Sequence, residues 1–166
     1  KEAGRDVIGV GKIEDIFNHR GLTNSNHAAG NPACLDAIAQ TLRSDHWKGL
    51  LFANLVDTDM LYGHRRDPQG YARSLEAFDQ RLPELMRLMG DDGLLIVTAD
   101  HGCDPTFRGT DHTRERVPVL CWSLAAQEGV DLGERKTFAD VSATVLEALG
   151  VENTLDGQSF WKDIED

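Results

Sequence analysis

The sequence is poor in cysteine: Cys34, Cys103 and Cys121 are the only three among its 166 residues. An odd number at such wide spacings excludes a disulfide framework and a paired-thiolate zinc site. A reducing cytoplasm is therefore the expected location. Long apolar runs are also missing, because none approaches the roughly 20 residues that span a bilayer, and we expect no transmembrane segment and no membrane partner.

Positive charge is scarce as well. The chain has 17 Lys and Arg residues against 28 Asp and Glu residues, a formal net charge of −11, and no basic cluster. Binding to phosphate backbones depends on clustered positive charge, so nucleic acid is not an expected partner. What is present, 40% hydrophobic and 27% charged residues, is typical of one globular domain and excludes a mainly disordered chain.

Apolar strand-like runs alternate with helical patterns, which predicts an α/β fold. The expected strands are residues 6–10, 50–56, 94–98 and 117–122, and the expected helices are residues 32–42, 70–89 and a third that begins at Thr137. Thr137 and Asp140 have the spacing of a capping box at the start of this third helix. Cys34 lies on the apolar side of the first helix, so we expect it in the core.

Three polar clusters lie at or near the ends of the expected strands, and the carboxyl ends of parallel strands are where ligands bind in an open sheet. The candidate metal-ligating residues are Asp59 and His64 in the first cluster, Asp100 and His101 in the second, and His112 in the third. On an α-helix, the five-residue offset of Asp59 and His64 would turn their side chains about 140° apart. We therefore expect a loop, bent at Gly63, to bring them together.

Each cluster taken alone has a plainer interpretation. Asp59 could cap a helix in a solvated loop, Asp100 and His101 could form a turn with Gly102, and His112 could be a hydrogen-bonded loop histidine. Taken together, three of the six histidines and two carboxylates gather at successive strand ends. This mixture of oxygen and imidazole donors suits manganese, zinc, iron or magnesium, and the lack of thiolates disfavours a structural zinc site.

Three segments carry a family resemblance: NLVDTDMLYGHRRDP (54–68), TADHG (98–102) and GTDHTRERVP (109–118). They resemble the C-terminal half of bacterial phosphopentomutases, which belong to the alkaline phosphatase superfamily. TADHG alone marks only the superfamily, whereas the GHRRDP extension is specific. The resemblance implies an alkaline-phosphatase-like α/β core, a mostly parallel sheet flanked by helices, that carries two divalent cations, with Mn²⁺ expected.

The resemblance also implies how the ligands divide between the two cations. Asp59, His64 and His112 would hold one, and Asp100 and His101 would hold the other. In the family, an upstream aspartate and a phosphoryl-carrying threonine complete the second site, and neither has a counterpart in this sequence, which begins with Lys1. We therefore expect residues 1–166 to be the C-terminal portion of the catalytic core, without its nucleophile, its N-terminal segment or its cap domain.

The implied activity is the interconversion of the 1-phosphate and 5-phosphate of ribose or deoxyribose through a phosphothreonine enzyme, with a pentose phosphate as substrate. Two alternatives remain open. One is a cofactor-independent phosphoglycerate mutase or a phosphatase of the same superfamily. The other is a non-catalytic metal-binding domain, since the expected fragment lacks the nucleophile.

Two basic side chains are candidates for binding the substrate phosphate. Lys12 follows the first expected strand, and Arg65 follows His64. The plainer interpretations are a surface lysine and a salt-bridged loop that orients His64. Cys103 stands where the superfamily commonly has asparagine, and nearby carboxylates should raise its thiol pKa and keep it unreactive.

Overall fold

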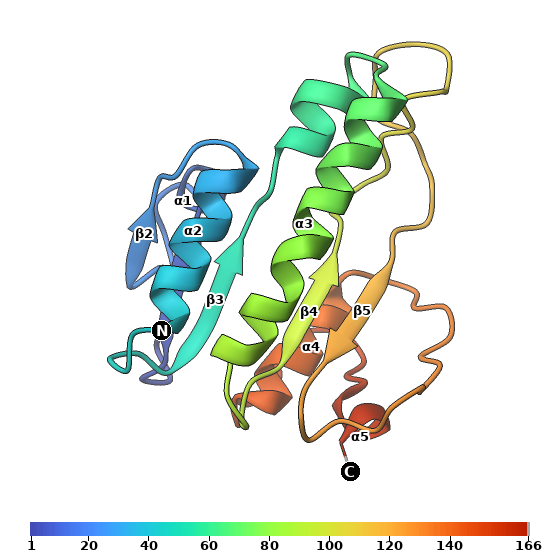
Figure 1. Cartoon of the computed structure of the whole chain (residues 1–166). Helices are drawn as coiled ribbons and strands as arrows, with labels where there is room; N and C mark the ends of the chain where they lie inside the picture. The colour runs from blue at the N-terminus through green and yellow to red at the C-terminus, as the bar shows by residue number, and fades with distance from the viewer. Residues whose placement is uncertain (166) are drawn as a thin grey trace.

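The computed structural model describes residues 1–165 and contains two sheets (Figure 1). The strands β1 (Asp6–Val10), β2 (Asn24–Asn26) and β3 (Gly49–Ala53) form a parallel sheet in the order β2-β1-β3. The strands β4 (Leu95–Thr98) and β5 (Val119–Trp122) form an antiparallel pair. The α/β prediction is confirmed, and each of the four expected strands is present within a few residues of its predicted ends.

Helices flank these strands (Figure 1). They are α1 (Ile13–Ile16), α2 (Asn31–Leu42), α3 (Pro68–Leu88), α4 (Ala139–Ala148), α5 (Trp161–Ile164) and the π-helix η1 (Thr58–Gly63). Both α2 and α3 have proline in the first turn, where its missing N–H costs nothing. The three predicted helices are confirmed, whereas β2, α1, η1 and α5 were not predicted because they are too short to show a clear period.

The predicted capping box of α4 is wrong. The Thr137 hydroxyl does accept a hydrogen bond from the backbone N–H of Ala139 at 3.2 Å. The Asp140 carboxylate, however, accepts from Arg135 Nε at 3.1 Å and from the backbone N–H of Gln158 at 2.9 Å. Asp140 is only 5% exposed, and a buried carboxylate requires charged and hydrogen-bonding partners of this kind.

Two clusters of buried residues lie on the two sides of α2. On one side, Cys34 and Ala37 pack with Val10 of β1. On the other side, Leu35 and Ala39 pack with Leu85 of α3. Cys34 is 2% exposed, as predicted from the helix pattern. The helix α2 is therefore held firmly between the parallel sheet and α3.

The carboxyl ends of β3 and β4 point toward the same end of the molecule, where η1 and the segment 99–118 lie (Figure 1). Within residues 1–165, β3 pairs only with β1, β4 pairs only with β5, and no ladder joins the two sheets. None of the helices in this part of the chain is long and apolar enough to cross a membrane. The fold thus brings the three polar clusters to one end, as the sequence predicted.

Candidate metal centre

Asp59 and His64 are brought together by η1 rather than by a loop bent at Gly63. In η1 the backbone N–H of His64 donates to the carbonyl of Asp59 at 3.1 Å, which is the i to i+5 bond of a π-helix. This wider turn brings residues five apart toward the same side of the helix, whereas an α-helix turns them well apart. Gly63 has a packing role instead, because a Cβ there would lie 2.5 Å from the sulfur of Cys103.

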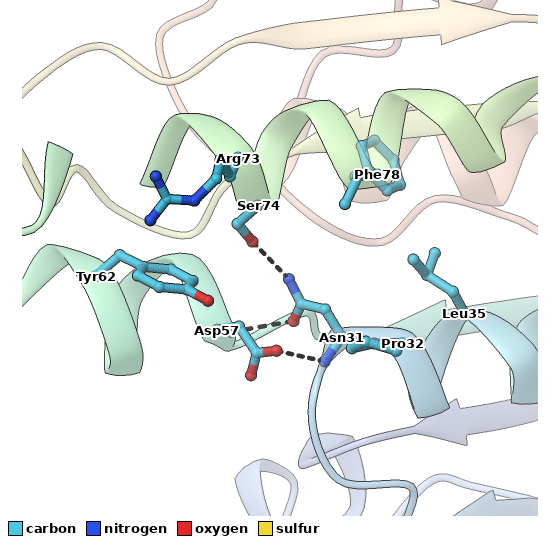
Figure 2. Close-up of a pocket in the computed structure, with 9 residues that line it drawn as sticks. Asn31, Pro32, Leu35, Asp57, Tyr62, Arg73, Ser74 and Phe78 are labelled. Carbon is cyan, nitrogen blue, oxygen red and sulfur yellow. Dashed lines mark hydrogen bonds between the residues drawn. The ribbon is translucent and has the colours of Figure 1, made fainter. Parts of the chain in front are cut away.

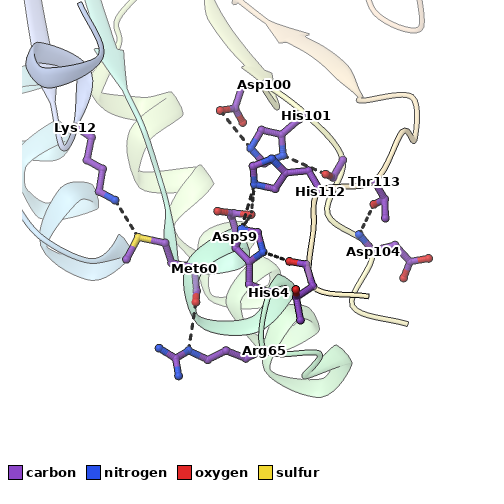
Figure 3. Close-up of polar contacts among 12 residues, drawn as sticks. Lys12, Asp59, Met60, His64, Arg65, Asp100, His101, Asp104, His112 and Thr113 are labelled. Carbon is purple, nitrogen blue, oxygen red and sulfur yellow. Dashed lines mark hydrogen bonds and ion pairs between the residues drawn. The ribbon is translucent and has the colours of Figure 1, made fainter. Parts of the chain in front are cut away.

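Three side-chain atoms converge beyond the end of β3 (Figure 3). Asp59 Oδ1 lies 3.3 Å from His64 Nε2 and 3.4 Å from His112 Nε2, and the two imidazole nitrogens are 3.1 Å apart. Ligands bound at about 2.1 Å are about 3.0 Å apart in adjacent octahedral positions and about 3.4 Å apart in a tetrahedron. The three donors therefore have the spacing of ligands around one divalent cation.

The hydrogen-bond pattern of this cluster also fits a cation. The backbone carbonyl of Thr110 lies beside His64 Nδ1 and can only accept, so Nδ1 is the donor of this pair and Nε2 is the nitrogen that faces Asp59 and His112. Asp59 Oδ1 is buried and has no hydrogen-bond partner among residues 1–165. A proton on His112 could serve only one neighbour at a time, whereas a cation would satisfy all three donors at once.

Asp100 and His101 lie next to this cluster but do not complete a second one. The ring of His101 stacks on that of His112, with centroids 3.7 Å apart. Asp100 Oδ2 is 3.7 Å from His101 Nε2, and the Asp100 side chain is 71% exposed. Within the described part of the chain, the only group of three or more mutually close donors is that of Asp59, His64 and His112.

Backbone contacts hold the segment that carries His112. The backbone N–H of Thr113 donates to the carbonyl of Gly102 at 3.0 Å, and the Thr113 hydroxyl accepts from the backbone N–H of Asp104 at 2.7 Å. Arg66 donates to the carbonyl of Gly109. The part played by the carbonyls of Gly109 and Thr110 could not be predicted from sequence, because a backbone acceptor leaves no signal in the residue type.

Lys12 and Arg65 lie on either side of Met60 and do not contact the three donors (Figure 3). Lys12 Nζ is 3.0 Å from Met60 Sδ, and Arg65 Nε donates to the Met60 carbonyl at 3.3 Å. The alternative of a salt-bridged loop that orients His64 does not form among residues 1–165, since Asp67 accepts from the N–H of Gly70 and pairs with Arg73 at 3.8 Å rather than with Arg65. The side chains of Lys12 and Arg65 are both exposed, at the end of the molecule where the three polar clusters meet.

Cys103 is buried beneath Gly63, with 8% of its surface exposed. Burial raises its thiol pKa to about 11, and the neighbouring Asp59 carboxylate adds to the effect. The thiol is therefore protonated at neutral pH, as predicted from the nearby carboxylates. Cys103 fills space behind Asp59 rather than acting as a nucleophile.

Known proteins resemble this chain in sequence and in fold. Phosphopentomutase from Alkaliphilus metalliredigens (strain QYMF) is 49% identical over 162 residues, which are 98% of this chain and 41% of that protein. Phosphopentomutase from Clostridioides difficile (strain 630) is 50% identical over 164 residues, 99% of this chain and 42% of that protein. The chain thus spans about two fifths of the length of these curated relatives.

Two solved structures share the fold. Leishmania mexicana phosphoglycerate mutase has a TM-score of 0.66 at 22% identity, covering 95% of this chain and 37% of that one. A protein from Pyrococcus horikoshii has a TM-score of 0.66 at 15% identity, covering 92% of this chain and 51% of that one. At such identities the likeness shows the fold alone. Because the model of the metalloenzyme superfamily matches residues 6–153, the chain belongs to that superfamily.

Proposed function

We propose that this chain is the metal-binding part of a phosphopentomutase, which interconverts the 1-phosphate and 5-phosphate of ribose or deoxyribose. The observation that carries the proposal is the convergence of Asp59, His64 and His112 at donor separations of 3.1 to 3.4 Å. Identities of 49% and 50% to phosphopentomutases support the choice of reaction within the superfamily. Phosphoglycerate mutase is supported less, since the solved example is 22% identical.

In this proposal Asp59, His64 and His112 hold one divalent cation, and Asp100 and His101 contribute to a second. The mixed carboxylate and imidazole set suits Mn²⁺. When bound, the two cations supply charge stabilisation to the oxygens of the transferring phosphoryl group. Asp59 and His64 keep their orientation through η1, while Lys12 and Arg65 attract and orient the phosphate of the pentose substrate.

We propose further that the chain is the C-terminal portion of a larger catalytic core that carries the nucleophile and the cap domain elsewhere. Three observations support this: the length of the relatives, the unpaired edges of β3 and β4 within residues 1–165, and exposed apolar side chains. Phe52 on β3 is 43% exposed and Leu120 on β5 is 61% exposed, which is unusual for strand residues of a complete core. Free thiols at all three cysteines support a cytoplasmic location.

The reaction can be tested on the parent protein that contains this chain and the remaining core. With Mn²⁺ present, ribose 1-phosphate and deoxyribose 1-phosphate should be converted to the 5-phosphates with a kcat/KM at least about 100-fold above that for 3-phosphoglycerate or a generic phosphate ester. Coupled assays of each product give the comparison. A preference for 3-phosphoglycerate would overturn the proposal.

The two cation sites should differ in occupancy in the chain by itself. Asp100 and His101 offer two donors, one on an exposed carboxylate, so they should bind metal weakly, whereas Asp59, His64 and His112 offer three. Anomalous scattering from crystals grown with Mn²⁺ should therefore show a strong peak beside His112 and a weak peak or none beside Asp100. Equal, full occupancy would mean that another residue completes the second site.

A further inference from the structure

Asn31 and Asp57 form a reciprocal pair of hydrogen bonds between two helices (Figure 2). Asn31 begins α2, and Asp57 immediately precedes η1. The backbone N–H of Asn31 donates to Asp57 Oδ2 at 2.8 Å, and the backbone N–H of Asp57 donates to Asn31 Oδ1 at 3.0 Å. Each side chain therefore caps the start of the other residue's helix.

The local sequence explains why the caps are exchanged. The residue at the N-cap of α2 is Gly30, which has φ of 80° and no side chain to accept a hydrogen bond. The Asp57 carboxylate supplies that acceptor, and its negative charge suits the positive end of the α2 dipole. The side chain of Asp57 makes no capping bond within η1, so the Asn31 amide oxygen supplies the one at η1.

The Asn31 side chain also reaches a third helix. Its amide Nδ2 donates to the hydroxyl of Ser74 in α3 at 3.3 Å. Asn31 is 7% exposed, so its amide is partnered within the protein rather than by bulk water. A single buried side chain thus joins the starts of α2 and η1 to the second turn of α3.

The pair of Asn31 and Asp57 joins α2, which is anchored in the core, to η1, which is short. The helix α2 is anchored in the core by Cys34 and Leu35, which are 2% and 4% exposed. The π-helix η1 has only six residues, and such short π-helical turns persist only where the surroundings hold them. Asp59 lies two residues after Asp57, so a shift at Asp57 moves the carboxylate of the metal cluster directly.

We infer that Asn31 and Asp57 are positioning residues that hold η1, and hence Asp59 and His64, in the arrangement that binds the cation. This inference rests on the metal site of the proposed function. A plainer role would be to stabilise α2 alone. That role predicts a change in thermal stability with no change in metal affinity, so the two can be separated.

The first test is the substitution Asn31→Ala, with Ala39→Gly as a matched control. Ala39 is buried in α2, 1% exposed, and lies roughly 12 Å farther along the helix axis, so the control weakens α2 without touching η1. Titration calorimetry with Mn²⁺ should show affinity about tenfold weaker for Asn31→Ala, as for supporting residues of metal sites generally. For Ala39→Gly the affinity should stay within about twofold of the parent chain's, well below that tenfold loss.

The variants should remain folded because the pair borders a small cavity. The cavity measures about 160 Å³ and is lined by Tyr62 and Phe78 as well as by the pair. When the Asn31 side chain is shortened, water can enter this cavity and accept a hydrogen bond from the Asp57 N–H that has lost its partner. The substitution therefore leaves no buried N–H without an acceptor. Melting temperatures measured beside each titration confirm that binding is compared between folded proteins.

The second test exchanges the two side chains. Asn31→Asp alone places two carboxylates together and should weaken Mn²⁺ binding at least as much as Asn31→Ala. The double variant Asn31→Asp/Asp57→Asn keeps an acceptor for each backbone N–H and removes the repulsion, and the Ser74 hydroxyl can donate where it accepted before. Its affinity should return to within about threefold of the parent chain, recovering most of the loss expected at such supporting residues.

Hydrogen exchange without metal gives an independent readout. The amides of Met60 and His64 donate to the carbonyls of Val56 and Asp59 at the start and the end of η1, and should exchange faster in Asn31→Ala but not in Ala39→Gly. Unchanged exchange and unchanged affinity in Asn31→Ala, with a lowered melting temperature, would overturn the inference and leave the metal site standing. A parent chain that binds no Mn²⁺ would instead overturn the proposed function, and the inference with it.

Discussion

Replacing His112 by alanine should abolish tight Mn²⁺ binding by this chain. His112 supplies one of the three converging donors, and two donors leave most of the coordination shell to solvent. The His112 side chain is 48% exposed, so its removal leaves no core cavity and the variant should fold. We expect affinity to fall by at least about 100-fold, above the range seen when only a supporting residue of a metal site is lost.

Two measurements check this result. Titration calorimetry gives the affinity, and thermal unfolding gives the coupled gain in stability. A ligand at 100 times its dissociation constant stabilises the folded state by about 2.7 kcal/mol, which corresponds to a rise of about 5 to 10 °C for a domain of this size. The parent chain should show that rise with Mn²⁺, and His112→Ala should not.

The matched control is His46→Ala. His46 is exposed and lies outside the cluster, so its removal changes the histidine count but not the site. This control should bind Mn²⁺ with the affinity of the unsubstituted chain and show the same rise in melting temperature. If His112→Ala bound Mn²⁺ as tightly as His46→Ala, the assignment of His112 as a ligand would be wrong.

The chain by itself should have no measurable mutase activity, even when loaded with Mn²⁺. A phosphoryl carrier must lie in line between donor and acceptor, and such positioning is worth effective molarities of about 10⁵ to 10⁸ M. We expect the carrier to lie outside these residues. Turnover of ribose 1-phosphate should therefore be at least about 10⁴-fold below the roughly 10 per second of an ordinary enzyme.

The assay is formation of ribose 5-phosphate by the purified chain with added Mn²⁺. The parent protein, with the remaining core present, is the positive control. The His112→Ala variant of the chain serves as the background, because slow hydrolysis of a generic ester by the metal site alone should disappear with it. Turnover near 10 per second would show a nucleophile within the chain, and the hydroxyls of Thr110 and Thr113 beside His112 would be the first to replace.

The position of the candidate metal cluster could be predicted from sequence because two simple signals agreed. Apolar runs located the strands, and polar residues directly after two of those runs, together with His112 just before a third, located the ends where a parallel arrangement gathers ligands. Asp59, His64 and His112 were predicted in this way, and the fold brings their donor atoms together. Asp100 and His101 were predicted by the same signals and lie beside them, with His101 stacked on His112.

The shape of the link between Asp59 and His64 could not be predicted. A five-residue offset is compatible with a bent loop or a π-helix, and local sequence does not distinguish them. The choice depends on contacts from distant segments: the Thr110 carbonyl at His64 and the close packing of Cys103 against Gly63. Such contacts exist only once the chain has folded, so a loop was predicted where η1 is found.

The sequence by itself determined the α/β class of this protein, its main helices and strands, and the donor chemistry of its candidate metal-ligating residues, since each depends on residue type and local period. The family resemblance groups Asp59, His64 and His112, whereas the tertiary structure decides how these donors are held. The cross-capping of α2 and η1 by Asn31 and Asp57 is the clearest case, since the two residues are 26 positions apart. No local pattern encodes a pairing of that kind, because it depends on how α2, η1 and α3 pack together.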